Sequence, residues 1–261
     1  CEFTVSVAES IASVAQAQAL TESLDANGKL KVAASAFDDG SLDDCSDSLV
    51  YKIALDTLNP VFVDSLEFGC VDTGTVAIAF SVCDEFGNAD TVITTLTIFD
   101  GVAPVAVCQD DTVYLDASGM GSIMPIDVDG GSTDNCEIVS RTVSESDFDC
   151  TDLGDNPVIL EVFDAAGNSD DCPANVLVLD TITPTANCVA PFTVYLNDQG
   201  LAGITAADVD NNSTDNCDVS VSIDTSSFNC DNVGPVTVTL TATDGTGNVA
   251  TCSTIVTVSD T

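Results

Sequence analysis

The sequence repeats itself at a spacing of about 80 residues, and this repetition constrains the fold more than any other feature. An Asp-Asn-Cys motif at 134–136 recurs at 215–217, and a Phe-x-Cys motif at 148–150 recurs at 228–230. Looser copies of the two motifs precede them, at 43–45 and 68–70. Tandem modules of one kind usually span distance or present surface, because a single buried active site needs no copies.

The repeats predict three modules, each of a usual size for a small domain. The modules comprise residues 11–101, 102–181 and 182–261. Residues 1–10 align with the end of a repeat, so we expect them to form the terminal strand of a preceding or partner module. The first module carries an insertion of eleven or twelve residues between Cys45 and Cys70. The links between modules are short and contain proline, which predicts tight joints.

Apolar and polar residues alternate along segment 236–243, where threonines separate Val, Val, Leu and Ala. Segments 158–162 and 78–82 show the same period of two. This period and the richness in Val, Ile and Thr are typical of half-buried strands in antiparallel sheets. Gly, Asn and Asp punctuate the strands every eight to twelve residues. The pattern predicts an all-β chain, a tandem array of immunoglobulin-like β-sandwiches.

The chain is strongly acidic, with 43 acidic residues, four basic residues and a formal net charge of −39. This charge excludes nucleic acid and anionic membranes as direct partners, because both require a positive protein surface. Of the acids, 35 are Asp and eight are Glu, and Asp is typical of turns and of oxygen ligands for hard cations. The charge opposes a compact fold unless cations bind. A halophile-like, solvating surface is the alternative interpretation.

An enzyme is the class that the sequence supports least. The chain has no His, and it has neither a Ser–base arrangement nor a glycine-rich phosphate loop. Paired carboxylates are the remaining catalytic candidates, but the acids recur in all three repeats instead of marking one of them. The sequence contains no apolar run of 18 residues, so no membrane span is predicted. Its hydrophobic content of 45% argues against disorder.

The second and third repeats each contain four cysteines in one order, and four cysteines allow three connectivities. The first repeat keeps the middle two and has Ala17 and Val92 in place of the outer two. Joint loss of the outer two indicates that they bond to each other. The predicted disulfides, which imply an oxidising compartment, are Cys45–Cys70, Cys108–Cys172, Cys136–Cys150, Cys188–Cys252 and Cys217–Cys230.

Two cysteines remain after this assignment, Cys1 and Cys83. An odd thiol in a secreted protein indicates intermolecular pairing. One interpretation is that Cys1 bonds outside this chain, to a neighbouring subunit or an upstream segment. The other is an intrachain Cys1–Cys83 disulfide, and the sequence leaves both open.

Acidic clusters recur in register and predict calcium sites where the modules join. Asp100 is expected to meet two loops of the second module, and Asp180 the equivalent loops of the third. Several Asp and Asn oxygens that converge with backbone carbonyls are typical of Ca²⁺ coordination. The alternative is that these residues only start turns. The candidate ligands are Asp38, Asp43, Asp84, Asn88, Asp100, Asp129, Asp134, Asp164, Asn168, Asp180, Asp210, Asp215, Asp244 and Asn248, with Asp260 in the position of Asp100 and Asp180.

The order Asp-Asn-Cys, Phe-x-Cys, a Val/Thr strand, Asp-x-x-Gly-Asn, Cys and Val-x-Val-x-Asp resembles the hyalin repeat. The resemblance covers the second and third repeats throughout, and the first with its outer disulfide replaced and an insertion added. It implies an immunoglobulin-like fold and an adhesive or structural role outside the cell or at the cell surface, as in bacterial surface proteins. It also implies Cys136–Cys150 and Cys217–Cys230 as the inner disulfides.

Two functions are predicted from these features. The first is a structural component of an extracellular, calcium-stiffened rod or filament, with self-association end to end or with neighbouring modules of a longer chain as its partners. The second is a cell-surface adhesin that binds a ligand through one variant module. The insertion that begins near residue 46, with Tyr51 and Lys52, is the candidate surface for the second function.

Overall fold

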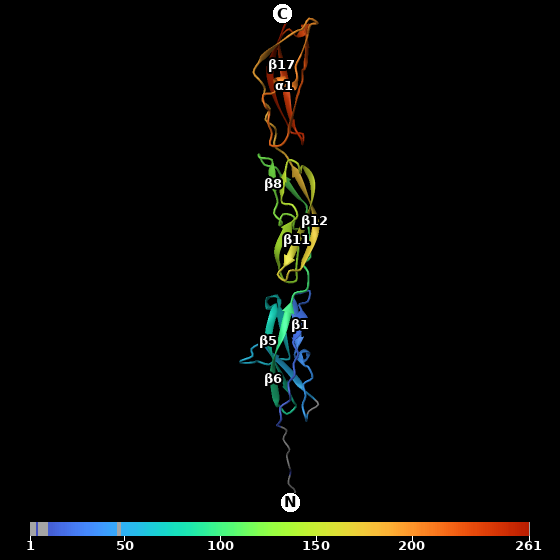
Figure 1. The fold of residues 1–261 in the computed structure, drawn as a ribbon, viewed down its shortest axis with the longest axis vertical. Helices are drawn as coiled ribbons and strands as arrows, with labels where there is room; N and C mark the ends of the chain where they lie inside the picture. The colour runs from blue at the N-terminus through green and yellow to red at the C-terminus, as the bar shows by residue number, and fades with distance from the viewer. Residues whose placement is uncertain (1–3, 5–9, 46–47, 261) are drawn as a thin grey trace. The chain divides into compact units, whose positions relative to one another are not determined.

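The computed structural model describes residue 4 and residues 10–45 and 48–260. They form an all-β chain of three immunoglobulin-like sandwiches (Figure 1). The chain packs into two compact units. Unit 1 contains Cys1–Ala106, Ser132–Arg141 and Glu161–Asp171, and unit 2 contains Val107–Gly131, Thr142–Leu160 and Cys172–Thr261. The terminal strand predicted over residues 1–10 lies outside the described residues, apart from positions 4 and 10.

The first sandwich pairs a four-stranded sheet with a two-stranded sheet. The larger sheet has the order β1-β6-β5-β3, in which β1 is parallel to β6 and the other pairs are antiparallel. Its strands are β1 (Leu20–Ser23), β3 (Val50–Ala54), β5 (Gly74–Cys83) and β6 (Ala89–Phe99). The smaller sheet joins β2 (Lys29–Ala33) to β4 (Ser65–Gly69), and 3-10 turns occupy Ala34–Phe37 and Cys70–Asp72.

The second and third repeats have the same topology as the first. In the second, the sheets have the orders β7-β12-β11-β9 and β10-β8. Their strands are β7 (Asp111–Tyr114), β8 (Met120–Ser122), β9 (Ile138–Val143), β10 (Asp147–Asp149), β11 (Gly154–Asp164) and β12 (Ser169–Leu179). In the third, the orders are β13-β18-β17-β15 and β14-β16. The elements are β13 (Phe192–Tyr195), β14 (Leu201–Gly203), α1 (Ala206–Val209), β15 (Val219–Ile223), β16 (Ser227–Asn229), a 3-10 turn at Cys230–Asn232, β17 (Gly234–Asp244) and β18 (Val249–Ser259).

The alternation of apolar and polar residues in the sequence matches the alternation of buried and partly exposed side chains along the strands. Along β17, Val238, Leu240 and Ala242 are fully buried, while the threonines between them face partly outward. The phenylalanine of each Phe-x-Cys motif belongs to the core as well, because Phe68, Phe148 and Phe228 are 1–4% exposed. Burial of these rings fixes the end of β4, β10 and β16, and the cysteine of the motif follows directly on each strand. In the described part of the chain, no helix has the length and apolar character needed to cross a membrane.

The insertion of the first repeat lengthens the connection between β3 and β4. Ile53 and Val63 form an antiparallel bridge across this hairpin. Tyr51 stacks on the buried Phe80 with ring centroids 5.9 Å apart, and Lys52 forms an ion pair of 2.6 Å with Asp64. The insertion is therefore a longer hairpin whose base is tied into the first sandwich.

Candidate metal centre

Four disulfides form among the described residues, in two kinds. Cys108–Cys172 and Cys188–Cys252 close their own repeats, with Cα–Cα distances of 5.9 and 5.8 Å. These two agree with the prediction for the outer cysteines. Cys70–Cys136 and Cys150–Cys217 instead connect each repeat to the next, with sequence separations of 66 and 67 residues. Cys70 and Cys136 both lie in unit 1, and Cys150 and Cys217 both lie in unit 2.

The predicted pairs Cys45–Cys70, Cys136–Cys150 and Cys217–Cys230 are wrong, and strand geometry gives the reason. In the third repeat, Val219 follows closely on Cys217 and pairs with Asp244 at the end of β17. Cys230, in contrast, begins the 3-10 turn Cys230–Asn232, which precedes the start of β17 at Gly234. A strand of 11 residues spans about 33 Å, whereas the Cα atoms of a disulfide lie within about 7 Å. The two inner cysteines of one repeat are thus at opposite ends of its longest strands.

Each disulfide that links two repeats packs against a tight turn that contains a glycine. Gly119 has a φ of +75°, and a Cβ there would lie 2.7 Å from Cys150 Sγ and 2.8 Å from the carbonyl oxygen of Asn216. Gly28 is its counterpart, with a φ of +67° and corresponding distances of 2.6 Å to Cys70 Sγ and 2.6 Å to the Asn135 carbonyl oxygen. Only glycine fits both the positive φ and the close approach.

The asparagine of each Asp-Asn-Cys motif ties the loop to the preceding repeat. Asn216 Nδ2 donates hydrogen bonds to Asp180 Oδ1 at 3.2 Å and to the Asp116 carbonyl oxygen at 3.3 Å. Asn135 Nδ2 donates to Asp100 Oδ1 at 3.1 Å and to the Asp25 carbonyl oxygen at 3.1 Å. Both asparagines use the side-chain nitrogen as the donor in these bonds. The side-chain oxygen of each residue therefore takes no part in them.

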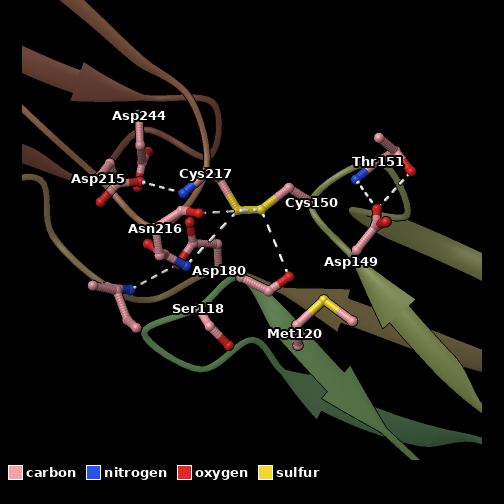
Figure 2. Close-up of a disulfide and its surroundings, with 12 residues drawn as sticks. Ser118, Met120, Asp149, Cys150, Thr151, Asp180, Asp215, Asn216, Cys217 and Asp244 are labelled. Carbon is pink, nitrogen blue, oxygen red and sulfur yellow. Dashed lines mark hydrogen bonds between the residues drawn. A yellow bond between two sulfur atoms is a disulfide. The ribbon is translucent and has the colours of Figure 1, made fainter.

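Three carboxylates of unit 2 converge beside the Cys150–Cys217 disulfide. Oxygens of Asp180, Asp215 and Asp244 all lie within 4.8 Å of one another. Asp180 and Asp244 are only 4% and 6% exposed. Figure 2 shows the Asp215 and Asp244 carboxylates close together, with Asp180 beside Asn216 and the disulfide. At separations up to 4.8 Å, two such charges repel by roughly 3 kcal/mol or more at an effective dielectric constant of about 20.

Several acceptor oxygens in this group are buried and receive no hydrogen bond from the described residues. They are Asp180 Oδ2, Asp215 Oδ1 and Asn216 Oδ1. Buried polar atoms are nearly always satisfied, and an acceptor without a donor is costly. A divalent cation bound among the carboxylates of Asp180, Asp215 and Asp244 would offset their repulsion. Because the set consists only of carboxylate and amide oxygens, it fits Ca²⁺ and not a soft metal.

The equivalent place in unit 1 is built less completely. Asp100 and Asp134 approach each other within 4.8 Å, and the third member of their group is Cys136. The Cys136 sulfur is bonded to Cys70 and is therefore not a thiolate ligand. Asp134 Oδ1 and Asn135 Oδ1 are again buried acceptors without a donor. The same two loop positions thus leave oxygens unsatisfied in both units.

Asn168 and Asn248 act as donors in the structure, although the sequence proposed them as oxygen ligands. Asn248 Nδ2 donates to Asp244 Oδ2 at 2.7 Å and to the carbonyl oxygens of Asp180 and Ile182 at 3.2 and 3.4 Å. Asn168 makes the corresponding bonds to Asp164, Asp100 and Val102. Burial raises the pKa of Asp244, but hydrogen bonds from Asn248, Thr246 and Gly247 outweigh it and hold this pKa below its usual 3.8.

The remaining candidate ligands make turns, and among the described residues they do not join a convergent group of carboxylates. Asp38 Oδ1 accepts from the Ser41 amide at 2.9 Å, Asp129 Oδ1 from the Gly131 amide at 3.0 Å, and Asp210 Oδ1 from the Ser213 amide at 3.0 Å. Asp84 accepts from Asn88 as Asp244 does from Asn248. Asp43 Oδ2 accepts from the Cys45 amide. The observed contacts of these residues are hydrogen bonds that stabilise tight turns.

Comparisons with known proteins return similarity of fold only. No protein-family model matches the sequence, and no curated protein matches it. Among solved structures, the I-band fragment I67–I69 of titin is 12% identical, with 95% of this chain and 96% of that chain covered and a TM-score of 0.39. Mouse cadherin-23 EC22–24 is 12% identical over 85% of this chain and 90% of that chain, with a TM-score of 0.34. The protocadherin γB4 extracellular domain is 13% identical over 95% and 49%, with a TM-score of 0.34.

Proposed function

We propose that this chain is a structural component of an extracellular rod or filament whose modules are joined and stiffened by calcium. The observation that carries the proposal is the group of buried, unsatisfied oxygens of Asp180, Asp215 and Asn216. The modules are those of the sequence division, residues 11–101, 102–181 and 182–261. The partners are further modules of the same kind, in this chain or in another copy.

The four disulfides support an extracellular location. Disulfides persist in oxidising environments and are rare in the cytosol. Two of them close single repeats, and the other two link successive repeats. A chain cross-linked at each joint resists unfolding and extension, which suits a load-bearing or scaffolding role.

Calcium would act at the joint through the residues that already meet there. Asp180 ends the second repeat, whereas in the third Asp215 lies in a loop and Asp244 ends β17. One ion bound by all three would tie the end of one module to the beginning of the next. It would also reduce the self-repulsion of a chain with a net charge of −39.

A cell-surface adhesin remains the second candidate function, on one specific observation. Leu58 and Val61, in the hairpin that only the first repeat has, are 88% and 80% exposed. The two residues first proposed for ligand contact are engaged elsewhere, since Tyr51 stacks on Phe80 and Lys52 pairs with Asp64. Replacing the hairpin tip with a short glycine turn should abolish attachment to cells if this function is correct. Unchanged attachment would argue against it.

Thermal unfolding in millimolar calcium and in excess EDTA tests the main proposal. A ligand that binds only the folded state stabilises it by about 4 kcal/mol per site at a thousandfold excess over Kd. We expect a higher midpoint in calcium for the native chain and a reduced shift for Asp215→Asn. Asp198→Asn removes the same charge from an exposed turn and should keep the full shift. Equal midpoints of the native chain in calcium and EDTA would refute the calcium joints.

A further inference from the structure

One loop of the third repeat contains two overlapping sequons for N-glycosylation. A sequon is an Asn followed two residues later by Ser or Thr, with any residue except Pro between them. Residues 211–213 and 212–214 both fit this pattern, and no other segment of the sequence does. A sequon is a credible modification site where its Asn lies on a surface loop of a secreted protein. The position and contacts of this loop therefore decide whether it can carry a glycan.

Position 212 directs its side chain away from the sandwich. Gly40, Gly131 and Asn212 each lie two residues after the aspartate of an isolated β-bridge in the same place of their repeat. Gly40 and Gly131 have φ values of +89° and +107°, and a Cβ at either one would meet no atom within 4 Å. Among the described residues, Asn212 is the one non-glycine residue with a positive φ, +56°. Its side chain is exposed, so the fold leaves room for a large substituent there.

The side chain of Asn212 is not used to hold the loop together. Its backbone carbonyl oxygen accepts a hydrogen bond of 3.2 Å from Asn187 Nδ2, but its own Nδ2 donates to none of the described residues. Asn135 and Asn216 differ, because their side-chain nitrogens hold the joints. A glycan on Asn212 Nδ2 would therefore cost the folded chain no hydrogen bond.

The two sequons differ in the state of their hydroxyl groups. Ser213, which completes the first sequon, donates through Oγ to Asp210 Oδ1 at 2.5 Å and accepts from a backbone amide at 3.0 Å. Thr214, which completes the second, is exposed. It pairs with the neighbouring segment through its backbone N–H and C=O groups, and its hydroxyl bonds to none of the described residues. The available hydroxyl thus belongs to the sequon of Asn212.

We propose that Asn212 carries an N-linked oligosaccharide. The proposal rests on the extracellular location in the proposed function, because sequons are modified in secreted proteins, and it does not depend on the calcium joints. The glycan is bulky and solubilising, and it lies three residues before Asp215 in the sequence. It keeps this loop in solvent, so the third module does not pack against a neighbour through it.

The modification is a group transfer from an oligosaccharide that is linked to a lipid diphosphate. Asn212 Nδ2 forms a bond to the anomeric carbon of the first sugar. The bond between that carbon and the diphosphate oxygen breaks, and the lipid diphosphate leaves with the electron pair. One proton of the amide passes to a base, and the transfer requires no oxidant or reductant.

The experiment uses the full chain, secreted by a eukaryotic cell line that N-glycosylates its proteins. A peptide N-glycosidase in heavy-oxygen water converts each glycosylated Asn into a labelled Asp, which mass spectrometry locates. We expect the label at position 212. The enzyme should release the glycan without prior unfolding, because the side chain is exposed. A sample without the enzyme controls for spontaneous deamidation, and no label, or a label at position 211, would overturn the proposal.

Two variants of the loop separate the overlapping sequons. Thr214→Val should lose the glycan although residues 211–213 keep a complete sequon, because Asn212 then lacks its hydroxyl. Asn211→Gln is the matched control and should keep the glycan. A glycan that survives Thr214→Val or disappears in Asn211→Gln would assign the modification to Asn211 and contradict the geometry.

The other repeats provide a test by gain of a glycan. Gly131→Asn completes an Asn-Ser-Thr sequence at the equivalent position of the second repeat and should add a second glycan. Gly40→Asn makes the same change in the first repeat, but position 42 is Leu, so it should add none. A secreted Gly131→Asn chain with one glycan would show that this loop position is not open to the modification.

Unfolding of the same secreted chain in calcium and in EDTA keeps the two proposals apart. Thr214→Val changes no proposed calcium ligand and should show the calcium shift of the parent. A calcium shift in a chain without a glycan refutes the glycosylation only. A glycan on a chain without a calcium shift refutes the calcium joints only.

Discussion

The amide of Asn216 donates a hydrogen bond of 3.2 Å to Asp180 Oδ1. Asp180 is 4% exposed, and the same amide nitrogen also bonds to the Asp116 carbonyl oxygen. One side chain thus connects a buried carboxylate, a turn of the second repeat and a loop of the third. Its counterpart, Asn135, makes the same two contacts in unit 1. In each unit, this asparagine amide therefore adds to the disulfide and to the hydrogen bonds of Asn168 or Asn248 at the same joint.

Asn216→Ala should lower the free energy of unfolding by about 1–3 kcal/mol, because Asp180 then loses a buried donor. Urea unfolding of the disulfide-intact chain measures this change. Gln199→Ala alters an exposed side chain and should stay within about 0.5 kcal/mol of the parent. Equal stability of Asn216→Ala and Gln199→Ala would show that the Asn216 contact contributes nothing.

Phe228→Ala should cost about 3–5 kcal/mol, since the ring is 2% exposed in the core of the third sandwich and its removal leaves a cavity. Urea unfolding again reports the change. Val233→Ala, at a site that is 54% exposed, is the control and should be nearly neutral. A cost below about 1 kcal/mol for Phe228→Ala would contradict the packing described for this core.

Gly119→Ala should hinder formation of the Cys150–Cys217 disulfide. The new Cβ would lie 2.7 Å from Cys150 Sγ at a φ of +75°, and neither condition suits alanine. Alkylation of the unfolded protein, followed by mass spectrometry, should reveal Cys150 and Cys217 as thiols. Gly245→Ala, where a Cβ meets no atom within 4 Å, should leave the disulfide intact. Full oxidation in both variants would show that the glycine is dispensable.

Acid should weaken the turn at Asp116. Hydrogen bonds, first from the Ser118 side chain and then from the Met120 and Ser118 amides, hold the pKa of Asp116 below its usual 3.8. The folded state therefore binds this proton less readily than the unfolded state does. The resulting stability is present above pH 3.8 and is lost as the pH falls through the lower folded pKa.

Asp116→Asn tests this pH dependence with little change of shape, because Asn197 makes the equivalent turn in the third repeat. Unfolding is measured in urea between pH 6 and pH 2. The variant should lose less stability on acidification than the parent does. Identical pH profiles for the two proteins would show that Asp116 does not contribute to acid sensitivity.

Parts of the site were predictable because they depend on local sequence. The joint positions Asp100 and Asp180 and the loop positions Asp134 and Asp215 were identified from the repeat alone, and each pair is close in the structure. The donor roles of Asn168 and Asn248 were not predictable, because an Asn side chain carries both a donor and an acceptor. Which of the two faces the joint depends on nearby carbonyl oxygens that only the folded chain supplies.

The sequence by itself determined the strands and the disulfides that close single repeats. Period-two alternation requires one face of a strand such as β17 to be buried, and the joint loss of the outer cysteines in the first repeat identified Cys108–Cys172 and Cys188–Cys252. Only the tertiary structure decided the partners of Cys70, Cys136, Cys150 and Cys217. The reason is distance: strands of 10 or 11 residues hold the inner cysteines of one repeat at opposite ends, so each meets the cysteine of a neighbouring repeat.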